Sequence, residues 1–269
     1  MKKITSFITF VALLFAIGTV QAQTENSSQP LRLKMLTYNV GHFNQGKLGG
    51  FQGSGEIAEA QLAAWRSWIG AQGADFMIVN EWNEFFDKDG KHKATEELLA
   101  PYYTNLYFGD KNEWIFNGIA TNYTLKNIRQ VAWFGQYYAV LGDLEVGDKT
   151  VTIISTHIPW QTEWHDEAVV KLKEELSKYD YFICMGDFNA KNKTFEEFKA
   201  LGYNVASGGA QGWFTTAPGG KMAGKIDVNI DNIVTSSGIK IMKVEAPLSG
   251  LNDLDHLPVM AEIIISTKK

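Results

Sequence analysis

The feature that most constrains the fold is a short apolar segment that ends abruptly in polar residues. It reads Tyr181-Phe182-Ile183-Cys184-Met185-Gly186-Asp187-Phe188-Asn189. A run of about four to eight apolar residues is typical of a strand that is covered on both faces. Gly186 permits a tight turn, so Asp187 and Asn189 can leave the apolar layer together. We therefore predict a buried strand that delivers a carboxylate and an amide to one end.

Other strand-like segments of the chain also end in a carboxylate, an amide or a histidine. Taken together, the polar residues at these ends are Asn39, Glu81, His157, Asp187, Asn189, Asp231 and the pair Asp255-His256. Strand ends are the places where α/β proteins build their binding and catalytic sites. The pattern predicts one site that is assembled from distant parts of the chain.

The order of the expected elements favours two packed sheets with helices outside them. Strands are expected at 31–40, 76–79, 102–108, 114–120, 137–145, 150–156, 181–185, 229–235, 239–244 and 259–266, and helices near 57–69, 95–99, 163–179 and 195–201. This order mixes hairpins with strand-helix-strand units, whereas a doubly wound fold would alternate strands and helices uniformly. The prediction is an α/β fold, a four-layer sandwich of two mixed or antiparallel sheets.

The N-terminal segment predicts export. Residues 1–22 combine two lysines, an apolar core and small residues before a cut after Ala22, which is the pattern of a cleaved secretory signal peptide. Residues 23–30 are expected to be a disordered lead, and 31–269 to form a single domain. The expected location is therefore the periplasm or the extracellular medium.

The charge balance argues against a strongly basic nucleic-acid clamp. The chain has 25 basic and 30 acidic residues, a net charge of −5; removing Lys2 and Lys3 leaves 23 against 30, a net charge of −7. Tight binding to a polyanion independent of sequence draws on many Lys and Arg contacts. A bound metal ion can still supply local positive charge.

The residue types at the strand ends are those of a divalent-metal site. Carboxylate and amide oxygens are ligands that suit Mg²⁺. Cys184 is the only cysteine, so a structural zinc site of cysteines is excluded. Histidines beside carboxylates can stabilise or protonate a developing oxyanion. The predicted cofactor is Mg²⁺, with Mn²⁺ as the alternative.

Six short motifs, in order, resemble those of the endonuclease/exonuclease/phosphatase superfamily. They are Thr37-Tyr38-Asn39-Val40, Asn80-Glu81, Thr156-His157, Gly186-Asp187-Phe188-Asn189, Ile230-Asp231-Asn232-Ile233 and Asp255-His256-Leu257-Pro258-Val259. This superfamily includes deoxyribonucleases, exodeoxyribonucleases, neutral sphingomyelinase and inositol-polyphosphate phosphatases. The resemblance covers nearly all of the chain after the signal peptide, and it implies the four-layer sandwich and metal-assisted hydrolysis of a phosphate ester by in-line attack of water.

The resemblance also implies a role for each matching residue. Asn39 and Glu81 would hold or support the metal, and Asp255 would lie near it. Asp187 would deprotonate the attacking water and Asn189 would position it. His157 and His256 would contact the scissile phosphate, with Asp231 orienting His256. Asn117 would be a further phosphate contact, through a looser match to a Gly-Asn-Ala motif.

Several alternatives stay open in the sequence. Asp227 competes with Asp231, which is preferred because a strand continues after it. Trp160 follows His157 closely, so it could border the cleft and touch a base, a sugar or lipid. Packing against the rest of the protein is the simpler explanation for this aromatic residue. His42, which matches no motif, is expected to be solvated.

The expected function is that of a phosphodiesterase, with nucleic acid as the favoured substrate. A phospholipid phosphodiesterase similar to sphingomyelinase, or an inositol-phosphate phosphatase, is the alternative enzyme. A catalytically silent binding module on the same fold is the alternative that is not an enzyme. No stable protein partner is implied, so a monomer is expected.

Overall fold

The computed structural model describes residues 29–267, apart from 49, 113 and 220–222. The predicted signal peptide, residues 1–22, and most of the predicted lead therefore lie outside the described residues. Within the described part of the chain, no helix combines the length and the apolar character needed to cross a membrane.

The first sheet has six strands in the order β11-β12-β1-β2-β4-β3. In chain order they are β1 (Leu31–Asn39), β2 (Phe76–Asn80), β3 (Asn105–Phe108), β4 (Gly118–Thr121), β11 (Ile239–Glu245) and β12 (Val259–Ile265). The central strands β1 and β2 run parallel, and the other neighbouring pairs run antiparallel. The parallel register puts Asn39 beside Asn80 where both strands end.

The second sheet also has six strands, in the order β5-β6-β7-β8-β10-β9. They are β5 (Lys126–Phe134), β6 (Tyr137–Val146), β7 (Lys149–His157), β8 (Phe182–Asp187), β9 (Asn204–Val205) and β10 (Asp231–Thr235). Here β7 and β8 are the parallel pair. The register puts His157 beside Asp187, and the antiparallel β10 puts Asp231 on the other side of Asp187.

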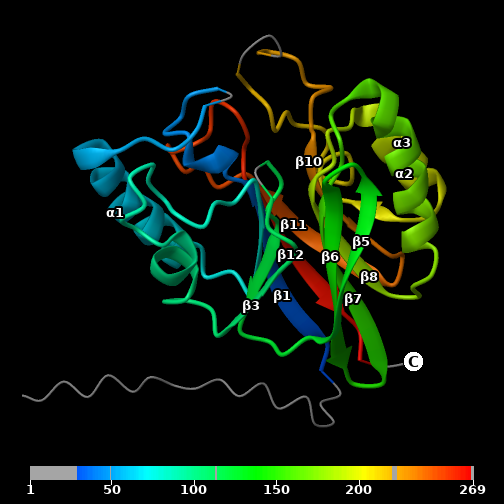
Figure 1. Ribbon diagram of the computed structural model, residues 1–269. Coiled ribbons are helices and arrows are strands. Elements are labelled where there is room, and N and C mark those ends of the chain that lie inside the picture. Colours follow the sequence, from blue (N-terminus) through cyan, green and yellow to red (C-terminus); the bar gives the residue numbers. More distant parts are fainter. Residues whose placement is uncertain (1–28, 49, 113, 220–222, 268–269) are drawn as a thin grey trace, which may run out of the picture.

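Helices cover the outer faces of the two sheets, so the layers run helix, sheet, sheet, helix (Figure 1). Helix α1 (Gly55–Gln72) covers the first sheet, and α2 (Thr162–Leu176) and α3 (Asn192–Ala200) cover the second. The two remaining short helices are η1 (Gly41–Phe43) and η2 (Thr95–Leu99). The predicted architecture of two packed sheets flanked by helices is confirmed.

Alternation along β1 explains how one strand joins both apolar layers. Successive side chains of a strand point to opposite faces of the sheet. Leu36 and Tyr38 pack in the cluster that contains the α1 residues, whereas Leu33 and Met35 pack in the cluster shared with the second sheet. All four are buried.

Two strands were not predicted from the sequence, β5 and β9. Most β5 residues are exposed or half-buried, because β5 is the edge of its sheet and pairs with β6 alone. An edge strand needs neither a continuous apolar run nor strict alternation, which are the signals that reveal a strand in sequence. Strand β9 is only two residues long.

Candidate active site

The site lies where the parallel strand pairs of both sheets end. Gly186 makes the close approach of β8 to β7 possible, since a Cβ at this position would lie 1.9 Å from the backbone oxygen of Thr156, at a φ of 144°. The strand continues to Asp187, the last residue of β8. Asp187 is therefore held against His157 at the end of β7 and Asp231 at the start of β10.

Two carboxylates from different sheets face each other across one amide group. The Nδ2 of Asn39 donates to Glu81 Oε1 and to Asp187 Oδ2, both at 3.0 Å. The Oδ1 of Asn39 accepts a hydrogen bond from the backbone N–H of Gly41 at 2.9 Å, and this bond fixes the orientation of the amide. Two negative groups held this close, one of them buried, call for a compensating positive charge.

His157 is a buried neighbour of both carboxylates. Its Nε2 lies 3.4 Å from Asp187 Oδ2 and 4.0 Å from Glu81 Oε1. Burial, and after it the charges of His256 and His42, lowers the pKa of His157 to about 3. The imidazole is therefore neutral near pH 7, and it can donate one hydrogen bond without carrying a charge.

His256 is paired with a carboxylate and is electrostatically the opposite of His157. Its Nδ1 lies 2.9 Å from Asp231 Oδ2, and its Nε2 lies 4.0 Å from Asp187 Oδ2. Burial by itself lowers the pKa of His256, but the charge of Asp231 and the hydrogen bond to it outweigh burial and raise that pKa well above its usual range. His256 is therefore a cation aimed at the site, with Asp231 fixing its ring. Asp227, the competing acid in the sequence, is exposed.

Asp187 and Asn189 are coupled through the turn after β8. The backbone N–H of Asn189 donates to Asp187 Oδ1 at 2.8 Å, while Asn189 Nδ2 donates to the backbone oxygen of Ile158 at 2.9 Å. Burial, followed by the negative charge of Asp231, raises the pKa of Asp187. A carboxylate in such surroundings readily takes up a proton, which is the property a general base needs.

Asn80 and Asn117 form a buried layer beneath these groups. Asn80 Nδ2 donates to Asn117 Oδ1 at 3.1 Å and to the backbone oxygen of Thr156 at 3.0 Å, and Asn80 Oδ1 accepts from the N–H of Asp187 at 3.1 Å. Asn80 thus ties the end of β2 to β7 and β8 in the other sheet. Asn117 is fully buried behind it, at 0 % exposure, so the structure places its side chain under the site instead of in the cleft.

A cleft of about 590 Å³ opens over the strand ends. The groups discussed above that line it are Glu81, Asp187, Asn189 and His256. Asp255 also lines it and accepts a hydrogen bond from Asn44 Nδ2 at 3.2 Å. Trp160 lines it as well, with its side chain 67 % exposed.

His42 is a further site residue, and the prediction that it is solvated is wrong. Its exposure is 5 %, and its Nε2 lies 3.4 Å from Glu81 Oε2. Its ring is stacked on Phe51, with the centroids 5.0 Å apart. One signal in the sequence could have identified it. Gly41, two residues after the last residue of β1, indicates a turn, and the backbone from Gly41 to Phe43 has positive φ throughout.

Three site residues hold strained backbone conformations. His42, Glu81 and Asn189 have φ values of 54°, 51° and 46°, in the left-handed region that residues other than glycine rarely adopt. Such strain persists only where the surrounding structure imposes it, and it is concentrated at functional sites. Here it turns the side chains of Glu81 and Asn189 into the cleft immediately after their strands.

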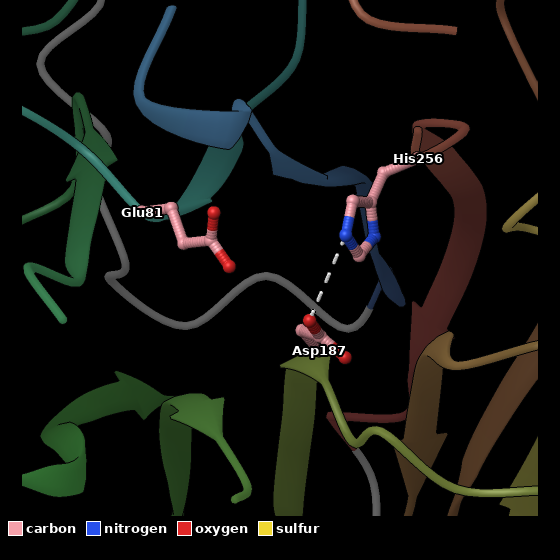
Figure 2. A group of neighbouring side chains, drawn as sticks. All are labelled: Glu81, Asp187 and His256. Carbon is pink, nitrogen blue, oxygen red and sulfur yellow. Dashed lines mark ion pairs between the residues drawn. The ribbon is translucent and has the colours of Figure 1, made fainter. Parts of the chain in front are cut away.

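Glu81, Asp187 and His256 offer ligand atoms that all lie within 4.8 Å of one another. Figure 2 shows Glu81 and His256 converging on Asp187 from different segments, with the ion pair between His256 and Asp187 drawn as a dashed line. The two carboxylates fit a hard divalent cation, because their oxygens already face one another. Asp255 is not one of these three residues. Asn39 supports the candidate metal site indirectly, because its amide holds the carboxylates of Glu81 and Asp187.

Comparisons with known proteins agree with the geometry. The family model described as Endonuclease/Exonuclease/phosphatase family matches residues 36–256. Comparison with curated protein sequences gave no match.

Solved structures share the fold at low sequence identity. An endonuclease/exonuclease/phosphatase from Beutenbergia cavernae is 14 % identical with a TM-score of 0.64, over 87 % of this chain and 72 % of that one. One from Bacteroides vulgatus has the same identity and TM-score, over 87 % and 98 %. Humanized TDP2 of D. rerio is 12 % identical with a TM-score of 0.64, over 86 % and 98 %. The chain therefore belongs to the Endonuclease/Exonuclease/phosphatase family, and it is a hydrolase that acts on phosphate esters.

Proposed function

We propose that this protein is an exported, Mg²⁺-dependent phosphodiesterase that works by in-line attack of water on phosphorus. One observation supports this most strongly: Asn39 Nδ2 holds the carboxylates of Glu81 and Asp187 together at 3.0 Å each, with His157 and His256 beside Asp187. The export part of the proposal comes from residues 1–22 alone.

Each residue has a distinct task in the proposed reaction. A divalent cation held by Glu81, with Asp187 and Asp255 near it, would neutralise phosphate charge and activate water. Asp187 accepts the proton of the attacking water, which Asn189 positions from the adjacent turn.

The two histidines stabilise charge on the phosphate oxygens in different ways. His256, held as a cation by Asp231, contributes positive charge, and the neutral His157 contributes a hydrogen bond. Preorganised groups of this kind are usually the largest contribution to catalysis.

A diester is preferred over a monoester because of the charges in the cleft. No Lys or Arg is present among the described residues that line it, and a monoester dianion would bring more negative charge than a diester. A silent binding module, the alternative that is not an enzyme, does not explain why the buried side chains of His157 and His256 both lie within 4.0 Å of Asp187 Oδ2.

The test is hydrolysis of bis-p-nitrophenyl phosphate with Mg²⁺, with Mn²⁺ and with chelator. Asp187→Asn and His256→Gln should each lower kcat by about a hundredfold or more, the typical contribution of an acid or base group. Asp148→Asn, in the exposed turn between β6 and β7, is the control and should retain full activity. Wild-type activity that survives chelation, or variants as active as the control, would overturn the mechanism.

Export is tested separately by expressing the full chain in a bacterium and fractionating the cells. The expected product outside the cytoplasm begins at Gln23, as read by N-terminal sequencing. Full-length protein that stays with the cytoplasm would contradict the export part alone and leave the chemistry untouched.

A further inference from the structure

Three aromatic rings from separate segments meet beside the cleft, and two of them, His42 and Trp114, line it. The ring of Phe51 lies 5.0 Å from that of His42, at an interplanar angle of 28°, and 5.1 Å from that of Trp114, at 58°. The rings of His42 and Trp114 are 6.0 Å apart, nearly perpendicular at 81°. We call these three side chains the aromatic cluster.

Two members of the aromatic cluster, Phe51 and Trp114, are exposed to an extent that core packing does not explain. Phe51 is 44 % exposed and Trp114 is 47 % exposed, whereas Trp65, Trp82 and Trp133, which pack in the core, are at most 2 % exposed. Leaving large apolar rings in water forgoes the stabilisation that burial would give them. Trp114 lines the same cleft as Glu81, Asp187 and His256, so its exposed ring is available to a ligand bound there.

A fourth ring borders the same cleft from the other sheet. Trp114 lies between β3 and β4 of the first sheet, and Trp160 follows β7 of the second sheet, three residues after His157. Both line the cleft, together with Tyr137, whose ring packs against His157 at 5.1 Å. A substrate phosphate at Asp187 would therefore have aromatic side chains within reach from both sheets.

The charges beside these rings limit how many phosphates the substrate carries. No Lys or Arg lines the cleft in the described part of the chain, and the whole chain is net acidic. A protein that tracks a nucleic-acid backbone needs several cationic contacts to its phosphates. A flat ring, by contrast, binds an aromatic platform by stacking, without any cation.

We propose that Trp114 and Trp160, with Phe51 packed against Trp114, form a subsite for a planar ring of nucleobase size on a substrate with one phosphodiester. This subsite defines the substrate class of the phosphodiesterase proposed above and rests on that function. The substrate is a small nucleoside-type ester. The sequence favoured nucleic acid as a class, and the subsite narrows that class to a small ester.

The test compares two substrates that share a leaving group. The p-nitrophenyl esters of thymidine 5′-monophosphate and of 1,2-dideoxyribose 5-phosphate both release p-nitrophenolate as water adds to phosphorus. They differ only in the thymine ring, which the second ester lacks. Wild-type kcat/KM should be higher for the thymidine ester by about tenfold or more, the effect of stacking one base. Trp114→Leu and Trp160→Leu should each reduce that ratio at least about threefold.

The variants avoid His42, because its contact with Glu81 would mix substrate binding with support of the carboxylate. Met242→Ala, a substitution of an exposed apolar side chain on the edge strand β11, is the control and should leave the ratio unchanged. Equal wild-type kcat/KM for the two esters would overturn the subsite, and so would tryptophan variants that lose kcat/KM equally for both esters. Either result would leave the phosphodiesterase function intact.

Binding of the methyl ester of thymidine 5′-monophosphate, a diester, gives a readout that does not depend on turnover. Titrated in chelator, it should quench tryptophan fluorescence in the wild type, the same diester without the thymine ring should not, and Trp114→Leu should weaken the binding. The subsite is overturned if the two ligands give the same response. It is also overturned if duplex DNA or sphingomyelin vesicles are cleaved with higher kcat/KM than the thymidine ester. If no ester is hydrolysed but the thymidine ligand still quenches the fluorescence selectively, the phosphodiesterase function is contradicted and the subsite is retained.

Discussion

His256 and Asp231 form a buried pair with Nδ1 and Oδ2 2.9 Å apart, and this pair sets the charge of the imidazole at the site. The carboxylate comes from the start of β10, and the histidine comes from the segment before β12 in the other sheet. The pair therefore spans the two sheets at the level of the cleft.

The first prediction concerns this pair. Asp231→Asn keeps the shape of the side chain but removes the charge that fixes the ring and stabilises its cationic form, so kcat for bis-p-nitrophenyl phosphate should fall by about 10²–10⁴-fold. The Mg²⁺ concentration for half-maximal activity should stay close to that of the wild type. Asp227→Asn, four residues earlier and exposed, is the matched control. A loss equal in both variants would show that Asp231 has no specific role.

The second prediction concerns the metal. Glu81→Gln removes one negative charge from a group that Asn39 Nδ2 holds at 3.0 Å, so Mg²⁺ should bind at least about tenfold more weakly, as titration calorimetry can measure. The control is Glu84→Gln, an exposed residue that pairs with Lys111. Unaltered Mg²⁺ affinity in Glu81→Gln would remove this residue from the metal site.

The third prediction is a pH dependence of stability. Burial lowers the pKa of His157 to about 3, below its usual value of 6.5. Between these values the unfolded chain binds a proton that the folded protein does not, so stability is lost as pH falls from 6.5 toward 3, at up to about 1.4 kcal/mol per pH unit. Urea denaturation in chelator should show a smaller acid loss for His157→Gln than for the wild type. Parallel curves would contradict the assignment.

The fourth prediction concerns the turn that aims Asp187. Gly186→Ala would put a Cβ 1.9 Å from the backbone oxygen of Thr156, so the free energy of unfolding should fall by about 4 kcal/mol or more. Gly73→Ala is the control, because its φ of 55° is also left-handed but no atom lies within 4 Å of the added Cβ. That variant should lose only about 1–2 kcal/mol. Equal losses in urea denaturation would mean that the close approach of β7 and β8 is unimportant.

The central strands could be predicted from sequence because their signals are local. The segment 181–189 has an apolar run and a polar end. The strand expected at 181–185 is present as β8, which occupies Phe182–Asp187 and therefore continues through Gly186. Strand β5 lacked such a signal, since an edge strand is exposed along much of its length. Its pairing with β6 is a tertiary contact that no local pattern reveals.

His42 shows which part of the site could not be predicted from the sequence. Because His42 matches no motif it is expected from sequence to be solvated, yet Phe51, Trp114 and Glu81 enclose it. Trp114 lies far from His42 in the chain. Burial of this kind depends on which loops meet in space.

The sequence alone determined which chemical groups stand at the strand ends and, through their order, the family and the sandwich of two sheets. Only the tertiary structure decided that Asn39 lies between two carboxylates and that Asn117 lies beneath the site. The sequence preferred Asp231 to Asp227 as the partner of His256, and the structure gives the distance of 2.9 Å that makes the pair. The physical reason is that hydrogen bonds and pKa shifts depend on distance and burial. Those are set when the two sheets pack, and so the neutral His157 and the charged His256 are chemically different although the sequence presents both simply as histidines.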